Sequence, residues 1–598
     1  MSQLEETMAP RKPKKPTKRP GKQPVTGKLP AYVEAQIASA PVGGRRAKSR
    51  GISPNELRRR LSESGGKSGG DAATLLRAVN RVDPKSAVPM DRIPAEVRAS
   101  ISALKHESRR FHGARLSLAW FPWSWLRSPC ADKFGYMSSP RVRALTKLPF
   151  NATSIGLMDQ LGELMGDPGR ETAPDSPIPA GFTYVGQFVD HDITLDVSST
   201  LDVATDANTI NNMRSPALDL DSVYGRGPAL DPFLYVFPSS GPSTAIRFLV
   251  GENTPVGPGG PAGAAGTPAA MVQKPDFDVP RAPTTRTAII GDPRNDENLI
   301  VSQFHHAMLR FHNRVVDMLV GAGFTGDLFV EAKRIVTHHY QWAVVHDFLE
   351  RICGPGAVAS ALASVSAPIG SPFRMPVEFS VAAYRFGHSM IRDRYWVNFN
   401  FPAATLGQVF EFVRVPRLPV FSNWVVDFNA FFGTGFIVPV NNKARKIDSV
   451  LASGLESLPG LSGLMAVLAQ RNLRRGLALG LPSGQGMAAQ FGTTSMTPAQ
   501  IQSGLPANEI AVLNSAGKLL LKKTPLWYYI LREAAVLKNG DQLGPVGARI
   551  VARTFVRMLK RNGASFVHAS GFTPTLPSAA PGTFTFADLV NFAGVTTP

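Results

Sequence analysis

The segment GQFVDHDI, residues 186–193, places one histidine between two aspartates. Such a set can form a metal site, a general acid/base pair or a hydrated surface. If the segment is helical, Gln187, Asp190 and His191 share one face, because side chains three and four apart align. Asp192 then points about 100° beyond His191 and roughly 200° from Asp190. The turn therefore serves two different sites, or it is simply a helix end with a hydrogen-bonded histidine; the residues alone favour neither.

A second polar segment, IIGDPRNDENL, has the features of a helix start. Asp292 is a favourable capping residue, and Pro293 suits a first-turn position. Arg294 and Glu297 then lie three apart on one face near that start. One interpretation is an arginine directed into a pocket beside a carboxylate that reacts or binds. The other is a surface ion pair of small energetic value.

A third segment, EFSVAAYRFGHSMIRDRYWVN, carries Arg385 and His388 three apart on a predicted helix. Gly387 removes side-chain bulk beside the histidine, which would let a large flat ligand approach the backbone. Imidazole is the commonest side-chain metal ligand, and a second hydrogen bond usually fixes its orientation. Taken alone, a structural histidine in the core is the simpler interpretation.

A fourth segment, NNMRSPALDLDSVYGRG, offers hard oxygen donors at alternating positions: Ser215, Asp219, Asp221 and a carbonyl such as that of Ala217. This spacing suits a loop folded around Ca²⁺, which takes six to eight oxygen ligands. The pattern is not that of an EF-hand. On its own it is also compatible with a helix-capping turn.

The composition restricts the class of protein. The chain has 598 residues, of which 43% are hydrophobic and 18% charged, as expected for a globular body. It contains no apolar run long enough to span a bilayer, and its first residues contain no apolar segment typical of a secretory signal. Two cysteines, Cys130 and Cys353, exclude a disulfide-rich scaffold and favour a reducing compartment. We expect a cytoplasmic or non-classically exported protein.

The net charge of +20 is concentrated at the N-terminus, where residues 1–130 hold 26 Lys and Arg against 10 Asp and Glu. We predict a basic disordered tail at 1–55, a short helical extension at 56–105, and one large, mainly α domain with long irregular loops at 106–598. The tail is suited to contact an anionic partner, although a spacer is an equally good interpretation.

Four motifs occur in the order and approximate spacing found in one family: GQFVDHDI, GDPRNDE…HNR, AAYRFGH and, later, RNLRRGLALGLP at 471–482. The chain resembles the animal-type haem peroxidases of the peroxidase–cyclooxygenase superfamily, and its bacterial members in particular, over about residues 106–590. The resemblance implies a haem peroxidase catalytic domain with haem b and Ca²⁺ as cofactors. It also implies reduction of H₂O₂ through a ferryl intermediate, with oxidation of phenols, pseudohalides or halides such as bromide, iodide and thiocyanate, and a response to oxidative stress.

The resemblance also implies roles for individual residues on the distal side of the haem. His191 matches the distal histidine, Arg294 the distal arginine, and Gln187 the glutamine that lines the peroxide and halide pocket. Asp190 and Glu297 match the two carboxylates that can form ester bonds to haem methyl groups.

On the opposite, proximal side, His388 matches the iron ligand. Arg385 and Asn472 match residues that support it, and Asn472 matches the one that hydrogen-bonds the imidazole. The implied calcium ligands are Asp192, Ser215, Ala217, Asp219 and Asp221.

Two positions depart from the family pattern. Asn298 follows Glu297, where the strongest halide oxidisers carry a methionine linked to haem through sulfur, so potent chloride oxidation is not expected. In the calcium loop, Asp221 stands where serine is frequent and Ala217 where an aromatic residue is common, which leaves the calcium affinity open.

Two alternative functions are compatible with parts of the sequence. A fatty-acid dioxygenase of the same superfamily needs a tyrosine three residues before the proximal histidine; that position holds Arg385, and Tyr384 is expected on a different helix face. The other alternative is a non-catalytic, basic-tailed binding protein on a peroxidase scaffold. The presence of His191, Arg294 and His388 together argues against it.

Overall fold

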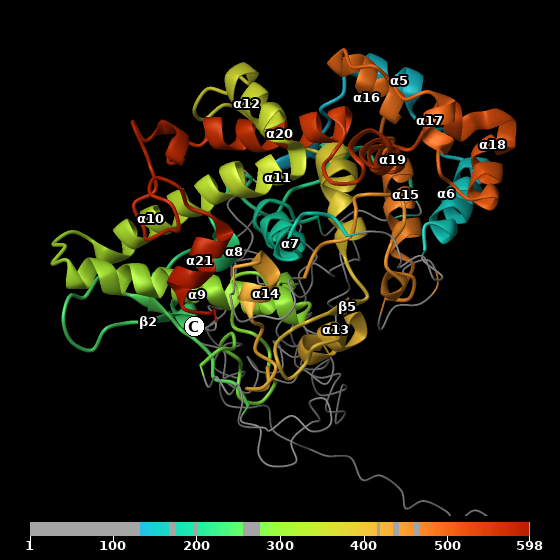
Figure 1. Cartoon of the computed structure of the whole chain (residues 1–598). Helices are drawn as coiled ribbons and strands as arrows, with labels where there is room; N and C mark the ends of the chain where they lie inside the picture. Colours follow the sequence, from blue (N-terminus) through green and yellow to red (C-terminus); the bar gives the residue numbers. More distant parts are fainter. Residues whose placement is uncertain are drawn as a thin grey trace, which may run out of the picture. The chain divides into compact units, whose positions relative to one another are not determined.

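The computed structural model describes residues 132–166, 175–196, 201, 203–254, 276–414, 419–434, 442–458, 463 and 466–596 (Figure 1). Helices predominate among them, as the apolar residues at helical spacing predict. All of them belong to one unit, Ser102–Pro598. The mainly α fold is confirmed. The predictions for residues 1–55 and 56–105 lie outside the described residues, as does most of the Gly/Pro/Ala-rich loop at 251–270.

The α-helices of the described residues are, in chain order, α5 Pro140–Thr146, α6 Ala152–Leu164, α7 Gly181–Ile193, α8 Asp221–Tyr224, α9 Leu299–Gly321, α10 Leu328–Ala343, α11 Glu350–Cys353, α12 Pro355–Ser364, α13 Leu406–Arg414, α14 Phe428–Phe432, α15 Leu468–Ala478, α16 Gly484–Phe491, α17 Pro498–Gln502, α18 Ala507–Lys522, α19 Leu526–Lys538, α20 Pro545–Arg561 and α21 Phe586–Ala593.

Strands contribute little among the described residues. Three two-stranded sheets are present: parallel β1 (Lys133–Gly135) with β4 (Arg374–Pro376), antiparallel β2 (Tyr235–Val236) with β3 (Arg247–Phe248), and antiparallel β5 (Arg394–Tyr395) with β6 (Ala404–Thr405). The pairing of β1 with β4 joins residues that are more than two hundred positions apart in the sequence.

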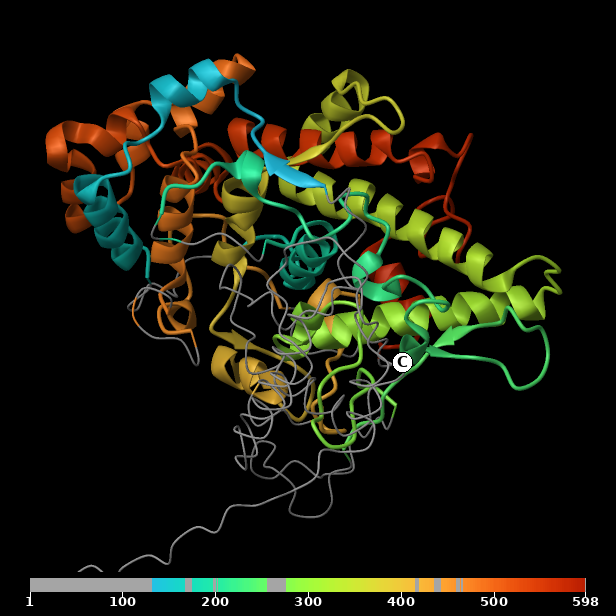
Figure 2. The ribbon, with the colours of Figure 1, turned by 180° about the vertical axis from the view of Figure 1, so that it is seen from behind.

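Helix α7 lies at the centre of the fold, surrounded by other helices (Figures 1 and 2). Its N-terminus has neither a side-chain cap nor an acidic residue in the first turn. Tertiary packing must therefore hold it, and most of its residues are buried. The Phe188 ring lies 5.1 Å from that of Phe304 on α9 and 6.2 Å from that of Tyr340 on α10. Burying one such ring contributes about 1.5–3 kcal/mol.

Two predicted helices have a different local geometry. Asp292 does cap a turn, but its side chain accepts from the amide of Arg294, and Pro293–Asp296 is a 3₁₀ segment. Helix α9 begins only at Leu299, where Asn298 provides the cap. The segment Ala383–Met390 is likewise 3₁₀ and follows a π-helical turn at Glu378–Ala382. Residues three apart still align in these segments, because a 3₁₀ helix has three residues per turn.

No described helix is long and apolar enough to cross a bilayer. Of the two cysteines, Cys353 is a buried free thiol. Cys130 lies outside the described residues.

Candidate active site

A cavity of about 860 Å³ separates α7 from the 3₁₀ segment Ala383–Met390. The α7 side contributes Gln187 and Asp190, and the opposite side contributes Arg385 and His388. The other lining residues are Phe182, Thr183, Tyr184, Gly186, Asn298, Ser380, Tyr384, Phe386, Gly387, Ile391, Leu406, Phe410, Leu455, Leu458 and Leu468. The cavity is thus largely apolar, with a few polar groups on two facing walls, as is usual for cofactor sites.

On the Ala383–Met390 wall, His388 is held from behind by α15. Its Nδ1 lies 2.8 Å from the side-chain amide nitrogen of Asn472, and Arg385 Nη1 donates to Asn472 Oδ1 at 3.3 Å. Burial, together with the charges of Arg385 and Arg471, holds the pKa of His388 well below its usual value. The imidazole is therefore neutral, which is the form that binds metals. A Cβ added at Gly387 would contact no atom within 4 Å, so the chain borders open space there.

On the α7 wall, Gln187 is fixed by two neighbours. It accepts a hydrogen bond from Asn298 Nδ2 at 3.0 Å, and its own amide donates to Glu297 Oε2 at 3.4 Å. Asp190 accepts from the Thr194 hydroxyl at 2.7 Å. Burial raises the pKa of Asp190 above its usual value, although the guanidinium groups of Arg385 and Arg294 oppose this shift. Glu297 is not among the lining residues.

His191 is fully buried and does not line the cavity, although Asp190, its neighbour on α7, does. Its Nδ1 lies 2.8 Å from Asn295 Oδ1, while the Asn295 amide nitrogen lies 3.0 Å from His305 Nδ1. Because a carbonyl oxygen only accepts, His191 carries its proton on Nδ1. Burial and the charge of Arg294 lower the pKa of His191 to about 3. At neutral pH, its Nε2 is therefore the basic nitrogen.

Arg294 does not line the cavity either. Its Nη2 donates to the backbone carbonyl of His191 at 2.9 Å and to Asp292 Oδ2 at 2.8 Å. Asp292 also receives Arg214 Nη2 at 2.5 Å, and these two guanidinium groups overcome the effect of burial and hold the pKa of Asp292 well below its usual value. The arginine is thus anchored to the helix that carries the histidine.

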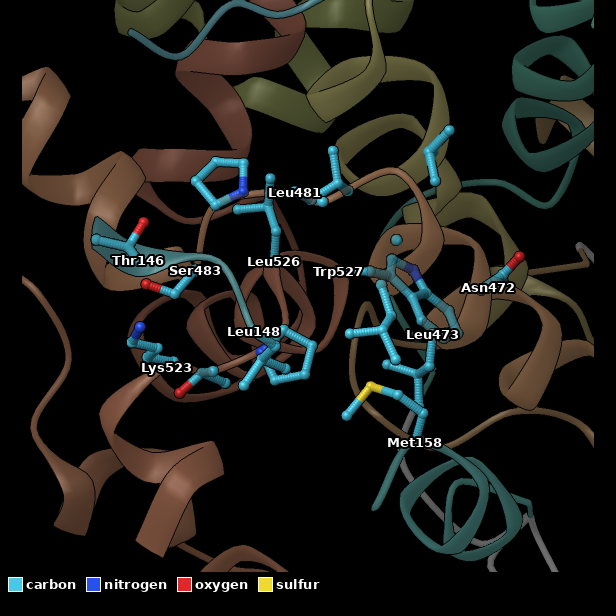
Figure 3. Close-up of a pocket in the computed structure, with 17 residues that line it drawn as sticks. Thr146, Leu148, Met158, Asn472, Leu473, Leu481, Ser483, Lys523, Leu526 and Trp527 are labelled. Carbon is cyan, nitrogen blue, oxygen red and sulfur yellow. The ribbon is translucent and has the colours of Figure 1, made fainter. Parts of the chain in front are cut away.

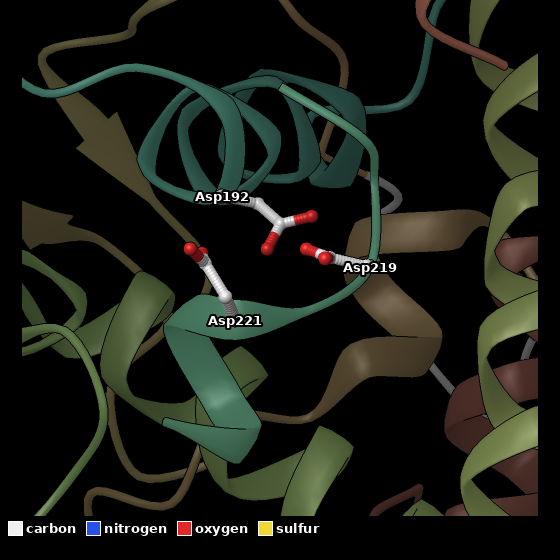
Figure 4. A group of neighbouring side chains, drawn as sticks. All are labelled: Asp192, Asp219 and Asp221. Atoms are coloured by element: carbon white, nitrogen blue, oxygen red, sulfur yellow. The ribbon is translucent and has the colours of Figure 1, made fainter. Parts of the chain in front are cut away.

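The angular argument for α7 agrees with the structure. Asp192 points away from the cavity toward Asp219 and Asp221, and one carboxylate oxygen from each of the three lies within 4.8 Å of the others (Figure 4). Burial raises the pKa of Asp192 well above its usual value, and the charges of Asp221 and Asp219 add to the effect. Like charges gathered in the interior require a cation or protons to compensate them.

The loop around this cluster has a strained backbone. Leu218 and Leu220 have φ values of 50° and 59°, which costs a non-glycine residue about 1–2 kcal/mol each. Ser215 donates its hydroxyl to Asp219 at 3.1 Å and its amide to Asp221 at 3.0 Å. These contacts draw the carboxylates together.

The Ala217 carbonyl, by contrast, faces other partners. It accepts from the side-chain amides of Asn562 at 3.2 Å and Gln341 at 3.4 Å. Of the five predicted calcium ligands, the structure therefore gathers the three aspartates, with Ser215 hydrogen-bonded to two of them. It gives no contact between Ala217 and the cluster.

A second, smaller pocket of about 410 Å³ lies behind Asn472 (Figure 3). It is lined by Trp527, whose indole N–H donates to the backbone carbonyl of Arg385 at 3.2 Å. Asn472 therefore lines this second pocket and also contacts His388, which lines the main cavity.

Tyr384, predicted on a different helix face from Arg385, also lines the main cavity. The Tyr384 ring stacks on Phe379 at 4.7 Å, and its hydroxyl is buried with no hydrogen-bond partner among the described residues. The cavity is wide enough for both side chains to reach it.

The sequence reasoning missed Arg214, Asn295 and Arg471. Arg214 contacts Asp292, and Asn295 contacts His191. Arg471 acts through its charge, which lowers the pKa of His388. All three partners are distant in the chain, so the spacing of residues in the sequence does not indicate these roles. Arg214 lies in the predicted calcium loop, and Asn295 lies in the segment IIGDPRNDENL. A polar side chain within a largely buried segment is the one sequence feature that could have indicated their roles.

A buried, neutral histidine thus lies on one wall of the cavity, and the opposite wall is a helix that carries a second neutral histidine and anchors Arg294 through its backbone. Histidine is a common axial ligand of haem iron, so this arrangement suits a haem cofactor. The family model described as animal haem peroxidase matches residues 202–560. The chain belongs to this animal haem peroxidase family.

Individual relatives agree with this assignment. The chain is 37% identical over 113 residues to a peroxidase-like protein of Margaritifera margaritifera, covering 17% of this chain and 14% of that protein. It is 25% identical over 301 residues to the chorion peroxidase of Drosophila melanogaster, covering 48% of this chain and 35% of that one. The matches span about a third or less of these relatives. Among solved structures, peroxidase A of Dictyostelium discoideum has the same fold, with a TM-score of 0.51 and 16% identity over 78% of this chain and 94% of that chain.

Proposed function

We propose that the protein is a haem-dependent peroxidase that reduces H₂O₂ and oxidises small donors, namely phenols, pseudohalides or halides. One observation carries the proposal: two walls of the cavity face each other. One wall holds His388, which contacts Asn472, and the other holds Gln187 and Asp190 of α7, next to His191.

The cavity fits a haem on three observations. His388 offers a neutral imidazole whose Nδ1 lies 2.8 Å from the Asn472 side-chain amide, which leaves Nε2 as the nitrogen that would coordinate iron. Coordination would place the proton on Nδ1, so the Asn472 amide would have to turn its oxygen toward Nδ1 to accept it. Gly387 leaves open space beside it. Asp190 provides a carboxylate on the other wall, between two guanidinium groups. When bound, haem would supply the iron that binds peroxide and takes part in electron transfer.

The residues of the chain then have distinct tasks. His191 Nε2 accepts the proton of the peroxide and returns it to the departing oxygen, while the Nδ1–H bond to Asn295 keeps the ring in that tautomer. Arg294, held by Asp292, stabilises negative charge on the departing oxygen. Gln187, fixed by Asn298 and Glu297, orients the bound peroxide or halide. The reaction consumes two electrons from donor molecules and releases water.

Two finer assignments belong to this proposal. Asp190 and Glu297 are the candidates for ester bonds to the haem, and Asp190 is the better placed, since it lines the cavity. The cluster of Asp192, Asp219 and Asp221 is a candidate Ca²⁺ site, because hard carboxylate oxygens surround one small volume. Further ligands would come from Ser215 or solvent.

Asn298 limits the range of donors. Its side chain caps α9 through Val301 N at 2.9 Å and also holds Gln187, so it is committed to positioning. An amide cannot form a sulfur link to haem, and we expect oxidation of iodide, bromide, thiocyanate and phenols rather than of chloride.

Reconstitution with hemin tests the proposal. The holoprotein should show a Soret band that changes on addition of H₂O₂. His388→Ala should abolish stable haem binding, and His191→Ala should retain haem but react with peroxide more slowly by roughly 10²–10⁴-fold. His346→Ala is the matched control, because His346 is half-exposed and pairs with Glu350. Unchanged peroxide reactivity in the His191 variant would reject the acid/base role.

Fatty-acid dioxygenation is a second candidate, favoured by one observation. Tyr384 lines the cavity and its buried hydroxyl has no hydrogen-bond partner among the described residues, so it is a candidate donor of a hydrogen atom to an oxidised cofactor. Oxygen uptake with a polyunsaturated fatty acid, lost in Tyr384→Phe, would support it. Peroxidase activity without such uptake would exclude it.

The anionic partner of the N-terminal tail and the cellular compartment stay predictions from the sequence. A salt-dependent pull-down by DNA, compared between the full chain and a chain lacking residues 1–55, would test the tail.

A further inference from the structure

A large open groove lies on the side of the fold where α20 packs against α12 and α16 (Figure 1). It encloses about 2580 Å³ and is distinct from the haem cavity, with which it shares no lining residue. The proposed peroxidase chemistry makes no use of it.

The rim of the groove is strongly basic. Five exposed cations line it, and none of the described lining residues is Asp or Glu. The cations are Arg374, Lys538, Arg549, Arg553 and Arg557. None of the five forms an ion pair with a described carboxylate, and two of them rest on neutral groups. Arg374 donates to Asn208 Oδ1 at 2.8 Å, and Arg549 donates to the Phe491 carbonyl at 2.5 Å. Their charges are thus available to a partner.

The floor of the groove, by contrast, is apolar. Ala361, Val365, Phe373 and Leu543 line it and are buried, and Arg557 lies over the Phe373 ring at 5.8 Å. A matching ligand therefore combines negative charges with apolar groups.

The spacing of the cations selects the geometry of that ligand. Arg549, Arg553 and Arg557 are four residues apart on α20, so they recur about every 6 Å along the helix. In an extended peptide, side chains on one face recur about every 6.6 Å. Successive carboxylates at alternate positions can therefore meet successive guanidinium groups, which bind carboxylates in bidentate fashion.

Two other occupants fit less well. Residues 1–130 of this chain carry 26 Lys and Arg against 10 Asp and Glu, so the basic leader is repelled. Single-stranded nucleic acid relies on exposed aromatic rings for base stacking. Three aromatic rings line the groove, and none is fully exposed. Phe373 is buried with the Arg557 guanidinium over its ring at 5.8 Å, Arg143 covers the Tyr136 ring at 3.9 Å, and Phe491 is partly buried.

We propose that this groove is a docking site for an extended acidic peptide segment of a partner protein, with acidic residues alternating with apolar ones. The site recruits the enzyme to that partner and leaves the chemistry in the haem cavity unchanged.

Fluorescence anisotropy with the full chain tests the proposal. The probe is a fluorescein-labelled peptide of alternating Glu and Leu, and a Gln/Leu peptide of equal length is its control. We expect saturable binding of the acidic peptide that weakens as salt is raised. The Gln/Leu peptide should not bind. Equal binding of both peptides would overturn the proposal.

Charge reversal locates the site. Combined Arg549→Glu, Arg553→Glu and Arg557→Glu should weaken binding of the acidic peptide by about tenfold or more. The same three positions changed to Lys should bind the peptide with an affinity between those of the unchanged protein and the Glu variant, because the charge is kept and the bidentate geometry is lost. A matched variant with Arg286→Glu, Arg314→Glu and Arg394→Glu alters exposed arginines outside the groove and has the same net charge.

Peroxide reactivity should be equal in all three variants, which confirms that they are folded. Equal loss in the groove variant and the matched variant would assign binding to net charge or to the leader and overturn the groove. Tighter binding of oligo(dT) or heparin than of the acidic peptide, lost with the same groove arginines, would overturn the choice of a peptide partner.

Discussion

Asp292→Asn tests the distal network more sharply than a change in either histidine. The substitution keeps the shape of the side chain and removes one negative charge from between two guanidinium groups. Asp292 Oδ2 lies 2.5 Å from Arg214 Nη2 and 2.8 Å from Arg294 Nη2, and the carboxylate side chain is only 1% exposed. Removing one partner from a buried ion pair costs about 3–5 kcal/mol, because the other charge is left uncompensated.

The same substitution should impair the chemistry. Arg294 is oriented by Asp292 through its Nε at 3.1 Å and its Nη2. In the proposed mechanism Arg294 stabilises the departing oxygen, so a displaced guanidinium group should slow the reaction with H₂O₂ by roughly 10²-fold. Urea unfolding followed by tryptophan fluorescence gives the stability, and stopped-flow absorbance of the holoprotein gives the rate.

Asp317→Asn is the matched control. Asp317 pairs with Arg247 at 2.6 Å, but the carboxylate side chain is 60% exposed and the pair lies outside the cavity wall. Its loss should cost about 1 kcal/mol and leave the peroxide reaction unchanged. If both variants unfold at the same urea concentration and react equally fast, the buried network has neither of the roles assigned to it.

Three further predictions follow from the site. Asn472→Ala should speed transfer of haem to apomyoglobin by about 10–100-fold, because His388 loses the group that orients it; an unchanged transfer rate would deny that role. Chelation of Ca²⁺ should lower the stability by about 2.7 kcal/mol if the ion was present at a hundred times its Kd, and Asp192→Asn should be insensitive to the chelator. Because the folded-state pKa of His191 is about 3 against 6.5, its contribution to stability is complete above about pH 6.5 and is lost as the pH falls toward 3. In that interval, the urea midpoint of His191→Gln should depend on pH less than that of the unchanged protein.

The sequence predicts much of this fold because its strongest signals are local. Helical periodicity predicted one large, mainly α domain, and helices predominate among the described residues. The angular relation between Asp190 and Asp192 predicted that one turn of α7 faces two directions, and the structure places the first in the cavity wall and the second in the aspartate cluster.

The contacts that the sequence did not predict are formed across long distances in the chain. The bond between His191 and Asn295 joins residues 104 positions apart, and that between Arg294 and the His191 carbonyl spans 103. Helical periodicity describes one face of one element and carries no information about the element it meets. For the same reason, periodicity separates Tyr384 from Arg385 but does not predict that both residues line the cavity.

The aspartate cluster and the distal side are physically connected, which bears on what a cation would do there. His191 and Asp192 are consecutive residues at the end of α7, so one rigid turn positions both. Arg214 connects the two regions a second time, since it lies 3.6 Å from Asp221 and 2.5 Å from Asp292. A divalent cation at the cluster would draw Asp221 toward itself and weaken its attraction for Arg214, leaving that guanidinium group more fully to Asp292. The metal would therefore act on the distal side through Asp292, which holds Arg294, and through the backbone of α7. Loss of such an ion should consequently change the positions of His191 and Arg294 while the chain is still folded.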